Sequence, residues 1–474
     1  MLPLIPQLDV NKKDPLYTQL YNYLKEEIRS KHIPAHSKLP SQRQLAHDLQ
    51  VSRNTVDAAY QQLLTEGYIQ SEARKGLFVV EIRNSFDPAA SSNNAAQQDS
   101  IEESVRNKSI PSMEGYDFKY GDVDIAHFPF KSWRRFAMKS LTAEEGSLLL
   151  YGEPQGERQL RKYIASYLSP SRGVNCSEDQ IVIGAGTQCL LSLLCKIIGK
   201  DLVYAMEEPG YDRVRLVLKD YGKRVVPICL DEQGFDVGAL SRSEAKVVYV
   251  TPSHQFPSGT VMSISRRLEL MDWARRTGGY IIEDDYDSEF RYEGKPIPSL
   301  QSLDRDENVV YMGTFAKSLI PSLRMGFMVL PVRLLAVYRE QFIGYKQTVS
   351  RLHQHTLTHF IESGEWSRHL KKARSRYKKR HQAILAAIQE RMGDRVRIQG
   401  SASGLHLLLE SDNGMTEDQL IAAAKNKGVN VYPVSPYYEM SPASAPAQVL
   451  LGFAGIDEKR ISEGIRLLAE AWFE

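Results

Sequence analysis

Two apolar segments that end in polar side chains decide the fold of most of the chain: GYIIEDDYD at residues 279–287 and NVVYMGTF at residues 308–315. Each is short and rich in β-branched and aromatic residues, which predicts a buried β-strand. Helical patterns such as TQCLLSLLCKIIG at residues 187–199 separate segments of this kind. Strands that alternate with helices predict an α/β domain with a mainly parallel sheet and helices on both faces. The other predicted strands are QIVIGAG (180–186), LVYAMEEPGY (202–211), RVVPICLD (224–231) and KVVYVTPS (246–253).

Lys317 follows the second of the two deciding strands, in GTFAKSLIPSLRMGF at residues 313–327. Ligands of parallel α/β sheets bind at the carboxyl ends of the strands. A lysine amine at that place can form a Schiff base with a carbonyl cofactor, and the nearby Thr314 and Arg324 can bind a phosphate group. A single lysine is more often an ordinary surface residue, so this interpretation depends on the neighbouring motifs.

Asp284 ends the first deciding strand, and Tyr286 follows it closely. A buried carboxylate can keep a pyridinium nitrogen protonated, which makes the ring an electron sink, and Tyr286 would then hydrogen-bond the phenolate oxygen of that ring. The acidic residues around Asp284 could instead form a solvated loop or a metal site. The apolar strand before Asp284 and the position of Lys317 downstream favour the cofactor.

Two further motifs fit the same cofactor. In VIGAGTQCLL (182–191) a strand runs into a glycine-rich turn and a helix, so the amides at its N-terminus would hold a phosphate. In EEPGYDR (207–213) Tyr211 would stack on an aromatic ring and Arg213 would bind an anion. The amides expected to hold the phosphate are those of Gly186, Thr187 and Gln188.

The first 80 residues carry a different pattern. Asp14-Pro15 predicts the start of a helix, with Asp14 as the cap and Pro15 in the first helical position. A second short helix is predicted from Ser41, and a third from the cap Ser52 to Gly67. Residues 68–82 read as two strands around Arg74-Lys75-Gly76. Helix, short turn and helix followed by a hairpin predict a winged helix-turn-helix.

The third helix begins with Ser-Arg-Asn-Thr, and the N-terminal residues of a recognition helix reach base edges in the major groove. Arginine can bind guanine and asparagine can bind adenine through two hydrogen bonds, while the helix N-termini and the basic wing suit phosphates. The alternative is an ordinary three-helix bundle with solvated charges. The predicted DNA-contacting residues are Ser41, Arg43, Ser52, Arg53, Asn54, Thr55, Arg74 and Lys75.

The net charge of +2, from 60 basic and 58 acidic residues, argues against a dominant nucleic-acid surface when it is taken alone. Residues 1–80 hold ten Lys/Arg and eight Asp/Glu, however, so the whole excess lies in the predicted DNA-binding part. Residues 83–112 are rich in Ser, Asn, Gln and Ala, which predicts a flexible linker. The expected domains are therefore 1–82, the linker 83–112 and an effector domain at 113–474.

The composition excludes several classes of protein. Of 474 residues, 42% are hydrophobic and 25% are charged, which is typical of a globular chain. No apolar run is long enough for a membrane span, and the start lacks the pattern of a secretory signal. The cysteines form no CxxC pair, so we expect a cytoplasmic protein without a disulfide framework or a metal site. They are Cys176, Cys189, Cys195 and Cys229.

The ordered motifs LPSxRxLA, VSRNTV and AYxxLxxEGY with the basic wing resemble the winged helix-turn-helix of the GntR family over about residues 14–80. The lysine, aspartate, glycine-turn and EEPGYDR motifs, in their order, resemble fold-type I aminotransferases over about residues 115–474. The fusion of the two resembles the MocR/GabR class of bacterial transcription regulators along essentially the whole chain. TPSHQFPSGT, IIEDDYDSEF and YMGTFAKSL are especially similar to the GABA-responsive members of that class.

The resemblance implies that pyridoxal 5'-phosphate (PLP) is the cofactor, with Lys317 as its Schiff-base lysine and Asp284 as the partner of its ring nitrogen. Tyr151 would reach the phosphate of the neighbouring subunit's cofactor. The resemblance further implies a head-to-tail, domain-swapped homodimer that binds promoter double-stranded DNA and a small-molecule effector in a bacterial cytoplasm. It places a small C-terminal lobe largely at residues 340–474.

Two departures from the family bear on the effector. Phe256 stands before Pro257 where aminotransferases usually place the asparagine that holds the ring oxygen, and His254 or Gln255 is a possible substitute. In addition, no arginine lies between residues 397 and 460, and Pro436 takes the place of the arginine that clamps a substrate carboxylate in the family. Loss of that hydrogen-bonded charge pair costs on the order of 2–3 kcal/mol.

These departures favour a regulator in which PLP itself is the signal, as in the PdxR branch, and which controls vitamin B6 synthesis genes. A regulator that responds to GABA or another amino acid is the second hypothesis for the effector. An active aminotransferase with an accessory DNA-binding domain is the third, although the missing arginine argues against it. A structural protein that has lost the cofactor is the fourth.

Overall fold

The computed structural model describes residues 8–9, 14–72, 75–81, 115–231, 233–292, 297–440 and 446–474. The chain divides into two compact units, Met1–Ser112 and Met113–Glu474, which are described separately here. The second unit begins where the effector domain was predicted to begin. The predicted linker at 83–112 and the predicted DNA-contacting residue Arg74 lie outside the described residues.

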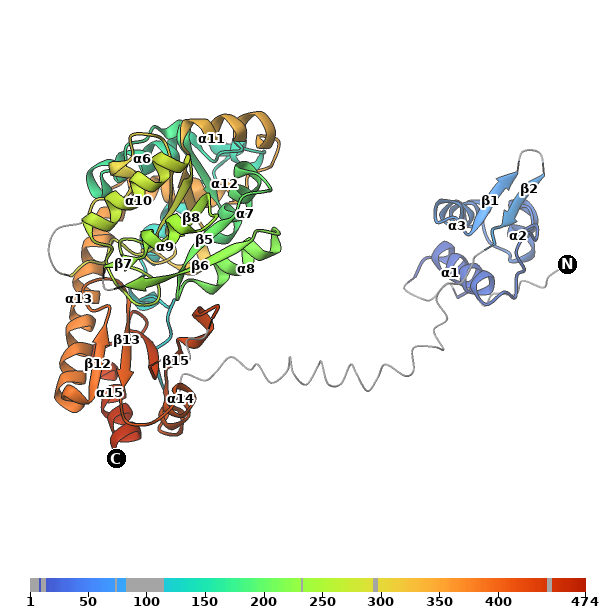
Figure 1. The fold of residues 1–474 in the computed structure, drawn as a ribbon. Helices are drawn as coiled ribbons and strands as arrows, with labels where there is room; N and C mark the ends of the chain where they lie inside the picture. The colour runs from blue at the N-terminus through green and yellow to red at the C-terminus, as the bar shows by residue number, and fades with distance from the viewer. Residues whose placement is uncertain are drawn as a thin grey trace. The chain divides into compact units, whose positions relative to one another are not determined.

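The N-terminal unit is a winged helix-turn-helix (Figure 1). Its third helix packs against the first and second, and the two strands form an antiparallel hairpin in which Ile69 pairs with Val79. Lys38 adds an isolated antiparallel bridge to Phe78, which extends the hairpin by one short segment. The elements are α1 (Leu16–Arg29), α2 (Gln42–Asp48), α3 (Arg53–Thr65), β1 (Ile69–Glu72) and β2 (Gly76–Val79).

Apolar residues at helical spacing form the core of this unit, as the sequence predicts. Leu20, Leu24, Val56, Tyr60 and Leu63 are fully buried together. The predicted start of α1 is wrong by one position. Pro15 occupies the cap position with an extended backbone and the helix begins at Leu16, so no side chain, including that of Asp14, caps it.

The C-terminal unit is built on an eight-stranded sheet with the order β4-β11-β10-β9-β8-β5-β6-β7. The central strands β10, β9, β8, β5 and β6 run parallel. β5, β8, β9 and β10 are buried along almost their whole length, as expected of strands covered on both faces, whereas β6 is only partly buried. The strands are β4 (Ile181–Gly184), β5 (Tyr204–Glu208), β6 (Val225–Asp231), β7 (Gly234–Phe235), β8 (Val247–Val250), β9 (Tyr280–Asp285), β10 (Val309–Thr314) and β11 (Gly326–Val329).

All six predicted strand segments are strands, whereas β11 was not predicted. It lies antiparallel between β10 and β4, and it carries the end of the lysine motif back through the sheet. Two antiparallel steps leave β4 pointing the same way as β10. The carboxyl ends of β4, β5, β8, β9 and β10 therefore meet along one edge of the sheet, where ligands bind in such folds.

Helices cover both faces of this sheet (Figure 1). One face is packed by α7, α8 and α11 around Leu191 and Val310, and the other by α6, α9, α10 and α12. The helices are α5 (Phe130–Lys139), α6 (Arg158–Arg172), α7 (Thr187–Ile198), α8 (Asp212–Asp220), α9 (Val237–Arg242), α10 (Ile264–Thr277), α11 (Val332–Val337) and α12 (Arg351–Glu362).

A smaller antiparallel sheet, with the order β12-β13-β16-β15, forms the small lobe. Helices α13 and α15 pack against each other and against Leu407 and Leu409 of this sheet (Figure 1). The elements are α13 (Glu365–Arg391), β12 (Val396–Gln399), β13 (His406–Ser411), α14 (Glu417–Asn426), β14 (Val429–Asn430), β15 (Tyr432–Pro433), β16 (Gln448–Gly452) and α15 (Glu458–Phe473).

The predicted start of the small lobe at residue 340 is too early. Leu357 and Phe360 of α12 lie in the core that α6 and β4 form, on the large sheet. The small-lobe core begins with Ala373 inside α13 and also takes in Phe118, next to β3 (Tyr116–Asp117), which pairs with β14. The lobe is therefore assembled from both ends of the unit, since β3 pairs with β14 and Phe118 joins the core of the lobe.

Candidate functional site

The N-terminus of α3 presents the polar residues that the sequence predicts for DNA contact. Ser52, Arg53 and Asn54 are exposed and Thr55 is half-buried. Arg43 on α2 is also exposed, and among the described residues it, Arg53 and Asn54 have no hydrogen-bond or ion-pair partner. These three side chains are therefore free to bind another molecule.

The predicted serines and the wing lysine already have partners within this unit. Ser41 accepts a hydrogen bond from the Gln44 amide at 3.2 Å, and Ser52 accepts one from the Thr55 amide at 3.1 Å. Both serines thus cap their helices, as predicted for Ser52. Lys75 on the wing forms an exposed ion pair with Glu72 at 3.1 Å.

In the C-terminal unit, most of the predicted site residues line one cavity of about 430 Å³ at the carboxyl edge of the large sheet. They come from five separate segments, which the parallel strands bring together. The predicted residues that line it are Gly186, Thr187, Gln188, Tyr211, Arg213, Asp284, Tyr286, Thr314, Lys317 and Arg324.

Lys317 lies in the wall of this cavity, just beyond β10. Its Nζ atom lies 4.0 Å from the centre of the Tyr120 ring. Burial lowers the pKa of Lys317 to about 8, although Asp287 and Asp122 act in the opposite direction. A larger fraction of the amine is therefore neutral near neutral pH than for an ordinary lysine, as a nucleophile requires.

Asp284 is the next-to-last residue of β9 and lines the same cavity. Its Oδ2 atom accepts a hydrogen bond from the Tyr249 hydroxyl, while Oδ1 is buried and has no partner among the described residues. Burial raises the pKa of Asp284 to about 7, and the Tyr249 hydrogen bond only partly offsets this. A cationic N–H group in the cavity would supply the missing partner and favour the charged carboxylate.

The turn between β4 and α7 forms an anion cradle. Gly186 has φ +87° as the cap of α7, so the amides that follow it are available at the positive end of the helix. Arg324 lies beside this turn, and a Cβ atom at Gly186 would stand only 3.1 Å from its Nη2 atom. The close approach of a guanidinium group and a helix N-terminus suits a phosphate.

Aromatic side chains line the space between Lys317 and the cradle. Tyr211 contacts the Phe256 ring edge-on, with the ring centroids 5.3 Å apart. Neither His254 nor Gln255 lines the cavity. The Gln255 amide points away from the cavity and donates to the Pro209 carbonyl at 2.9 Å.

Tyr151, which was predicted to reach a neighbouring subunit's cofactor, lies outside the cavity. It is 86% exposed, and the Nζ atom of Lys346 lies 5.2 Å from the centre of its ring. Its exposure leaves it available to a second copy of the chain.

The comparisons with known proteins match this division into two units. A model of the family "Aminotransferase class I and II" matches residues 116–468, and a model of "Bacterial regulatory proteins, gntR family" matches residues 16–79. The chain is 35% identical over 473 residues to the "Probable rhizopine catabolism regulatory protein MocR" of Rhizobium meliloti, which covers 98% of this chain and 95% of the relative. The chain belongs to the MocR group of GntR-family regulators.

Other relatives of this MocR-type regulator also carry names of regulators. It is 44% identical over 472 residues to the "Uncharacterized HTH-type transcriptional regulator YhdI" of Bacillus subtilis, covering 99% of this chain and 98% of the relative. It is 29% identical over 456 residues to the "HTH-type pyridoxine biosynthesis transcriptional regulator PdxR" of Corynebacterium glutamicum, covering 95% and 94%. A GntR-type head implies that the MocR-type chain binds DNA.

Solved structures of aminotransferases share the fold of the second unit. The multiple substrate aminotransferase of Thermococcus profundus matches with a TM-score of 0.68 and 25% identity, covering 78% of this chain and 94% of that one. A kynurenine aminotransferase of Pyrococcus horikoshii in complex with PMP matches with a TM-score of 0.66 and 25% identity, covering 82% and 96%.

The aminotransferase-type unit of this MocR-type regulator therefore binds PLP, and its cavity fits that group. The unpaired oxygen of Asp284 suits the ring nitrogen, the cradle at Gly186 suits the phosphate, and the Lys317 amine suits the aldehyde. PLP supplies an aldehyde that a lysine amine can attack and a ring that withdraws electrons.

Some cavity residues of the MocR-type chain were not predicted. Sequence offers little signal for them, because a tyrosine in or after a strand is equally common in a core. Tyr437 follows Pro436 in the VSPYY segment, and it lines the cavity whereas Pro436 does not. The unpredicted residues include Lys119, Tyr120, Tyr249, Thr251, Tyr432 and Tyr437.

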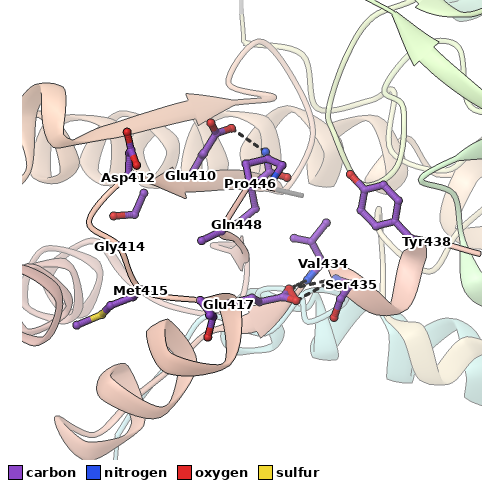
Figure 2. Close-up of a pocket in the computed structure, with 13 residues that line it drawn as sticks. Glu410, Asp412, Gly414, Met415, Glu417, Val434, Ser435, Tyr438, Pro446 and Gln448 are labelled. Atoms are coloured by element: carbon purple, nitrogen blue, oxygen red, sulfur yellow. Dashed lines mark hydrogen bonds between the residues drawn. The ribbon is translucent and has the colours of Figure 1, made fainter. Parts of the chain in front are cut away.

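The small lobe of the MocR-type chain holds a second, larger cavity of about 520 Å³, shown in Figure 2. Gln448 donates to Glu410 at 2.8 Å, and Glu417 accepts from the Val434 and Ser435 amides. None of the predicted site residues lines this cavity, and its carboxylates would repel a phosphate. It is therefore not the PLP site, although residues 434–438 contribute to the walls of both cavities.

Two general features complete the description of this MocR-type chain. All four cysteines are free. In the described parts of the chain, no helix has both the length and the apolar character needed to cross a bilayer.

We expect the rate of covalent PLP uptake by the apo protein to rise about tenfold per pH unit up to about pH 8 and to level off above it. Burial lowers the pKa of Lys317 to about 8, and only the neutral amine attacks the aldehyde. The growth of the visible absorbance band after mixing, followed over a series of pH values, measures this rate. A rate that still climbs near the pKa of an ordinary lysine, about 10.4, would contradict the expectation.

Proposed function

We propose that this chain is a PLP-dependent DNA-binding transcription regulator in which PLP, attached to Lys317, controls promoter binding. The observation that carries the proposal is that Lys317 and Asp284, which has an unpaired buried oxygen, line the same cavity. The domain that contains it is fused to a GntR-type head, and the relatives are named as regulators.

We further propose that PLP itself is the effector and that the controlled genes are those of vitamin B6 synthesis. The chain has no arginine between residues 397 and 460, so the segment around Pro436 has none to clamp the carboxylate of an amino acid. The relative PdxR is named for control of pyridoxine biosynthesis, which supports this assignment. On this proposal the aminotransferase-type domain is a sensor and not an enzyme.

A regulator that responds to GABA or another amino acid is the second candidate. Arg213 and Lys119 both line the cavity and are cationic, which favours a ligand with a carboxylate. An active aminotransferase would also need cationic groups such as Arg213 and Lys119 to bind its substrate. Sustained turnover of an amino acid with a keto acid would distinguish such an enzyme from a regulator.

PLP can regulate promoter binding only if it binds two arrangements of the protein with different affinity. We propose that the protein is a head-to-tail, domain-swapped homodimer. PLP binding would change the spacing of its two DNA-reading heads. The exposure of Leu149, Leu150 and Tyr151, which are 74%, 72% and 86% exposed, supports contact with a second copy at this segment. Direct repeats in the promoter would suit such a dimer.

A titration of the apo protein with PLP, read by visible absorbance and by binding to DNA upstream of vitamin B6 synthesis genes, tests the proposal. We expect promoter binding to change with the same midpoint as the absorbance, and later addition of GABA or common amino acids to have no further effect. A change in promoter binding that requires GABA or an amino acid in addition to PLP would assign the effector role to that compound. Promoter binding that ignores PLP would overturn the proposal.

We expect Arg53→Ala to weaken specific promoter binding by about 1–3 kcal/mol without changing PLP absorbance. Arg53 is exposed at the N-terminus of α3, where a recognition helix reads bases, and it has no partner among the described residues. Electrophoretic mobility shift with promoter and scrambled DNA measures the effect.

The matched control for Arg53→Ala is Lys75→Ala on the wing. It should weaken binding to both DNAs alike and reduce the salt dependence, because it removes a phosphate contact. Equal losses on promoter and scrambled DNA for Arg53→Ala would contradict base reading by this residue.

A further inference from the structure

A buried polar group lies directly behind the wall of the PLP cavity. The Nδ1 atom of His254 lies 3.0 and 3.2 Å from the two carboxylate oxygens of Asp287, and 3.1 Å from the Tyr286 hydroxyl. His254 and Asp287 are each 2% exposed. Of the three residues, only Tyr286 lines the cavity.

These contacts determine which nitrogen of His254 carries the proton. A carboxylate only accepts hydrogen bonds, and among the described residues His254 is the sole side chain that donates to Asp287, so Nδ1 carries the hydrogen. The Nε2 atom is buried without a partner, which agrees with an unprotonated nitrogen there.

The His254 ring is also held in place. The backbone of Gly404 lies so close to it that a Cβ atom at Gly404 would stand 1.9 Å from its Cε1 atom. The ring of His406 packs on it, with centroids 4.7 Å apart. The ring therefore presents the same nitrogen to Tyr286 and Asp287.

The tautomer of His254 controls what the Tyr286 hydroxyl can do. Because Nδ1 carries a hydrogen, it cannot accept the tyrosine proton. The hydroxyl instead donates to the His254 backbone carbonyl at 2.9 Å, which is a neutral acceptor. An anionic oxygen in the cavity would be a stronger acceptor than this carbonyl.

We propose that Asp287 and His254 are positioning residues that keep the Tyr286 hydroxyl available as a donor to the ring oxygen of PLP. The inference rests on the proposed contact between Tyr286 and that oxygen. It explains how the site works with Phe256 at the position of the usual asparagine, since a phenyl ring donates no hydrogen bond and Tyr286 has to supply it.

The test measures the pKa of the PLP chromophore by absorbance titration of the holoprotein. A hydrogen bond to the ring oxygen stabilises the deprotonated, more anionic form of the chromophore, so its loss raises the pKa. We expect Tyr286→Phe to raise the chromophore pKa by about one unit, which corresponds to about 1.4 kcal/mol. Asp284, Tyr120 and Glu207 also face Tyr286 and are unchanged in every variant.

We expect Asp287→Asn to raise the chromophore pKa in the same direction and by a similar amount. Replacing the aspartate of an Asp–His pair by asparagine keeps the geometry but permits the other tautomer. The Nδ1 atom would then carry no hydrogen and would accept a hydrogen bond from the Tyr286 hydroxyl, which lies 3.1 Å away. Ser403→Ala is the matched control and should titrate like the wild type, because it removes a buried, unpartnered hydroxyl that lines a separate small cavity with His254 and Asp287.

The double variant Asp287→Asn with His254→Phe separates positioning from a merely structural role. It removes the competing acceptor, so we expect the chromophore pKa to return to the wild-type value. The carboxylate charge and the imidazole are both removed, so no buried charge is left unpaired in the double variant.

The possible results have distinct meanings. A shift in Tyr286→Phe without one in Asp287→Asn would overturn this inference and leave the proposed role of Tyr286 intact. A double variant that shifts as far as Asp287→Asn alone, or further, would also overturn it. The absence of a shift in Tyr286→Phe would overturn the proposed contact of Tyr286 with PLP, and this inference with it.

Discussion

Lys317→Ala is expected to abolish the covalent attachment of PLP and the visible absorbance of the holoprotein, and with them any effect of PLP on promoter binding. Lys119 also lines the cavity, but Lys317 is the lysine that follows β10 at the carboxyl edge of the sheet, with its Nζ atom 4.0 Å from the centre of the Tyr120 ring. Absorbance after addition of PLP and a promoter-binding titration measure the two losses. Basal DNA binding should persist, because the DNA-reading residues belong to the other unit.

Lys346→Ala is the matched control for this prediction. Lys346 lies outside the PLP cavity, where its Nζ atom contacts the Tyr151 ring at 5.2 Å. This variant should keep the absorbance of the wild type. If Lys317→Ala lost its absorbance and still responded to PLP at the promoter, the sensor role of the covalent bond would be wrong.

Arg172→Met is expected to destabilise the aminotransferase-type unit by about 3–5 kcal/mol. The Arg172 Nε atom forms a buried ion pair with Asp285 at 2.6 Å, and its Nη2 atom donates to Ser253 at 2.6 Å. Asp285 directly follows Asp284 on β9, so the loss would leave a buried carboxylate without its cationic partner in the strand that carries Asp284. Urea unfolding followed by tryptophan fluorescence reports this unit selectively, since the four tryptophans all lie beyond residue 113.

Two controls accompany Arg172→Met. Replacing the pair together, as Arg172→Met with Asp285→Leu, should recover much of the lost stability because no charge remains buried alone. Arg224→Met breaks an exposed ion pair with Glu244, whose side chains are 66% and 69% exposed, and should leave the unfolding midpoint near that of the wild type. A similar unfolding midpoint for Arg172→Met and Arg224→Met would contradict the expectation that breaking the buried ion pair destabilises the unit more than breaking the exposed one.

Much of the fold follows from local patterns. A short run of β-branched and aromatic residues such as VVYV at residues 247–250 is typical of a strand buried on both faces, so the strand segments were predictable. β11 was not, because its residues Gly326–Val329 adjoin the lysine motif and form a strand only by pairing with β10 and β4. The small-lobe boundary was wrong for the same reason, since the side chains of α12 could pack on either lobe until the tertiary contacts are known.

The cavity residues that could be predicted are those whose chemical type is distinctive and which lie near the end of a predicted strand. Lys317, Asp284 and Gly186 follow apolar strands, and all three line the cavity. For residues inside a loop, the sequence could not predict which side chains point into the cavity. Gln255 and His254 have donors that suit a ring oxygen, yet they turn toward Pro209 and Asp287 while Phe256 faces the cavity.

By itself, the sequence determined the division into a DNA-reading head and a PLP-binding domain, and it pointed to Lys317 and Asp284, which line the same cavity. Strand period, helix caps and residue chemistry are local properties that a single chain carries. Only the tertiary structure decided that Tyr120, Tyr249 and Tyr437 line the cavity and that His254 contacts Tyr286. Which side chains line the cavity depends on contacts between segments far apart in the sequence, because a position filled by one side chain is closed to another.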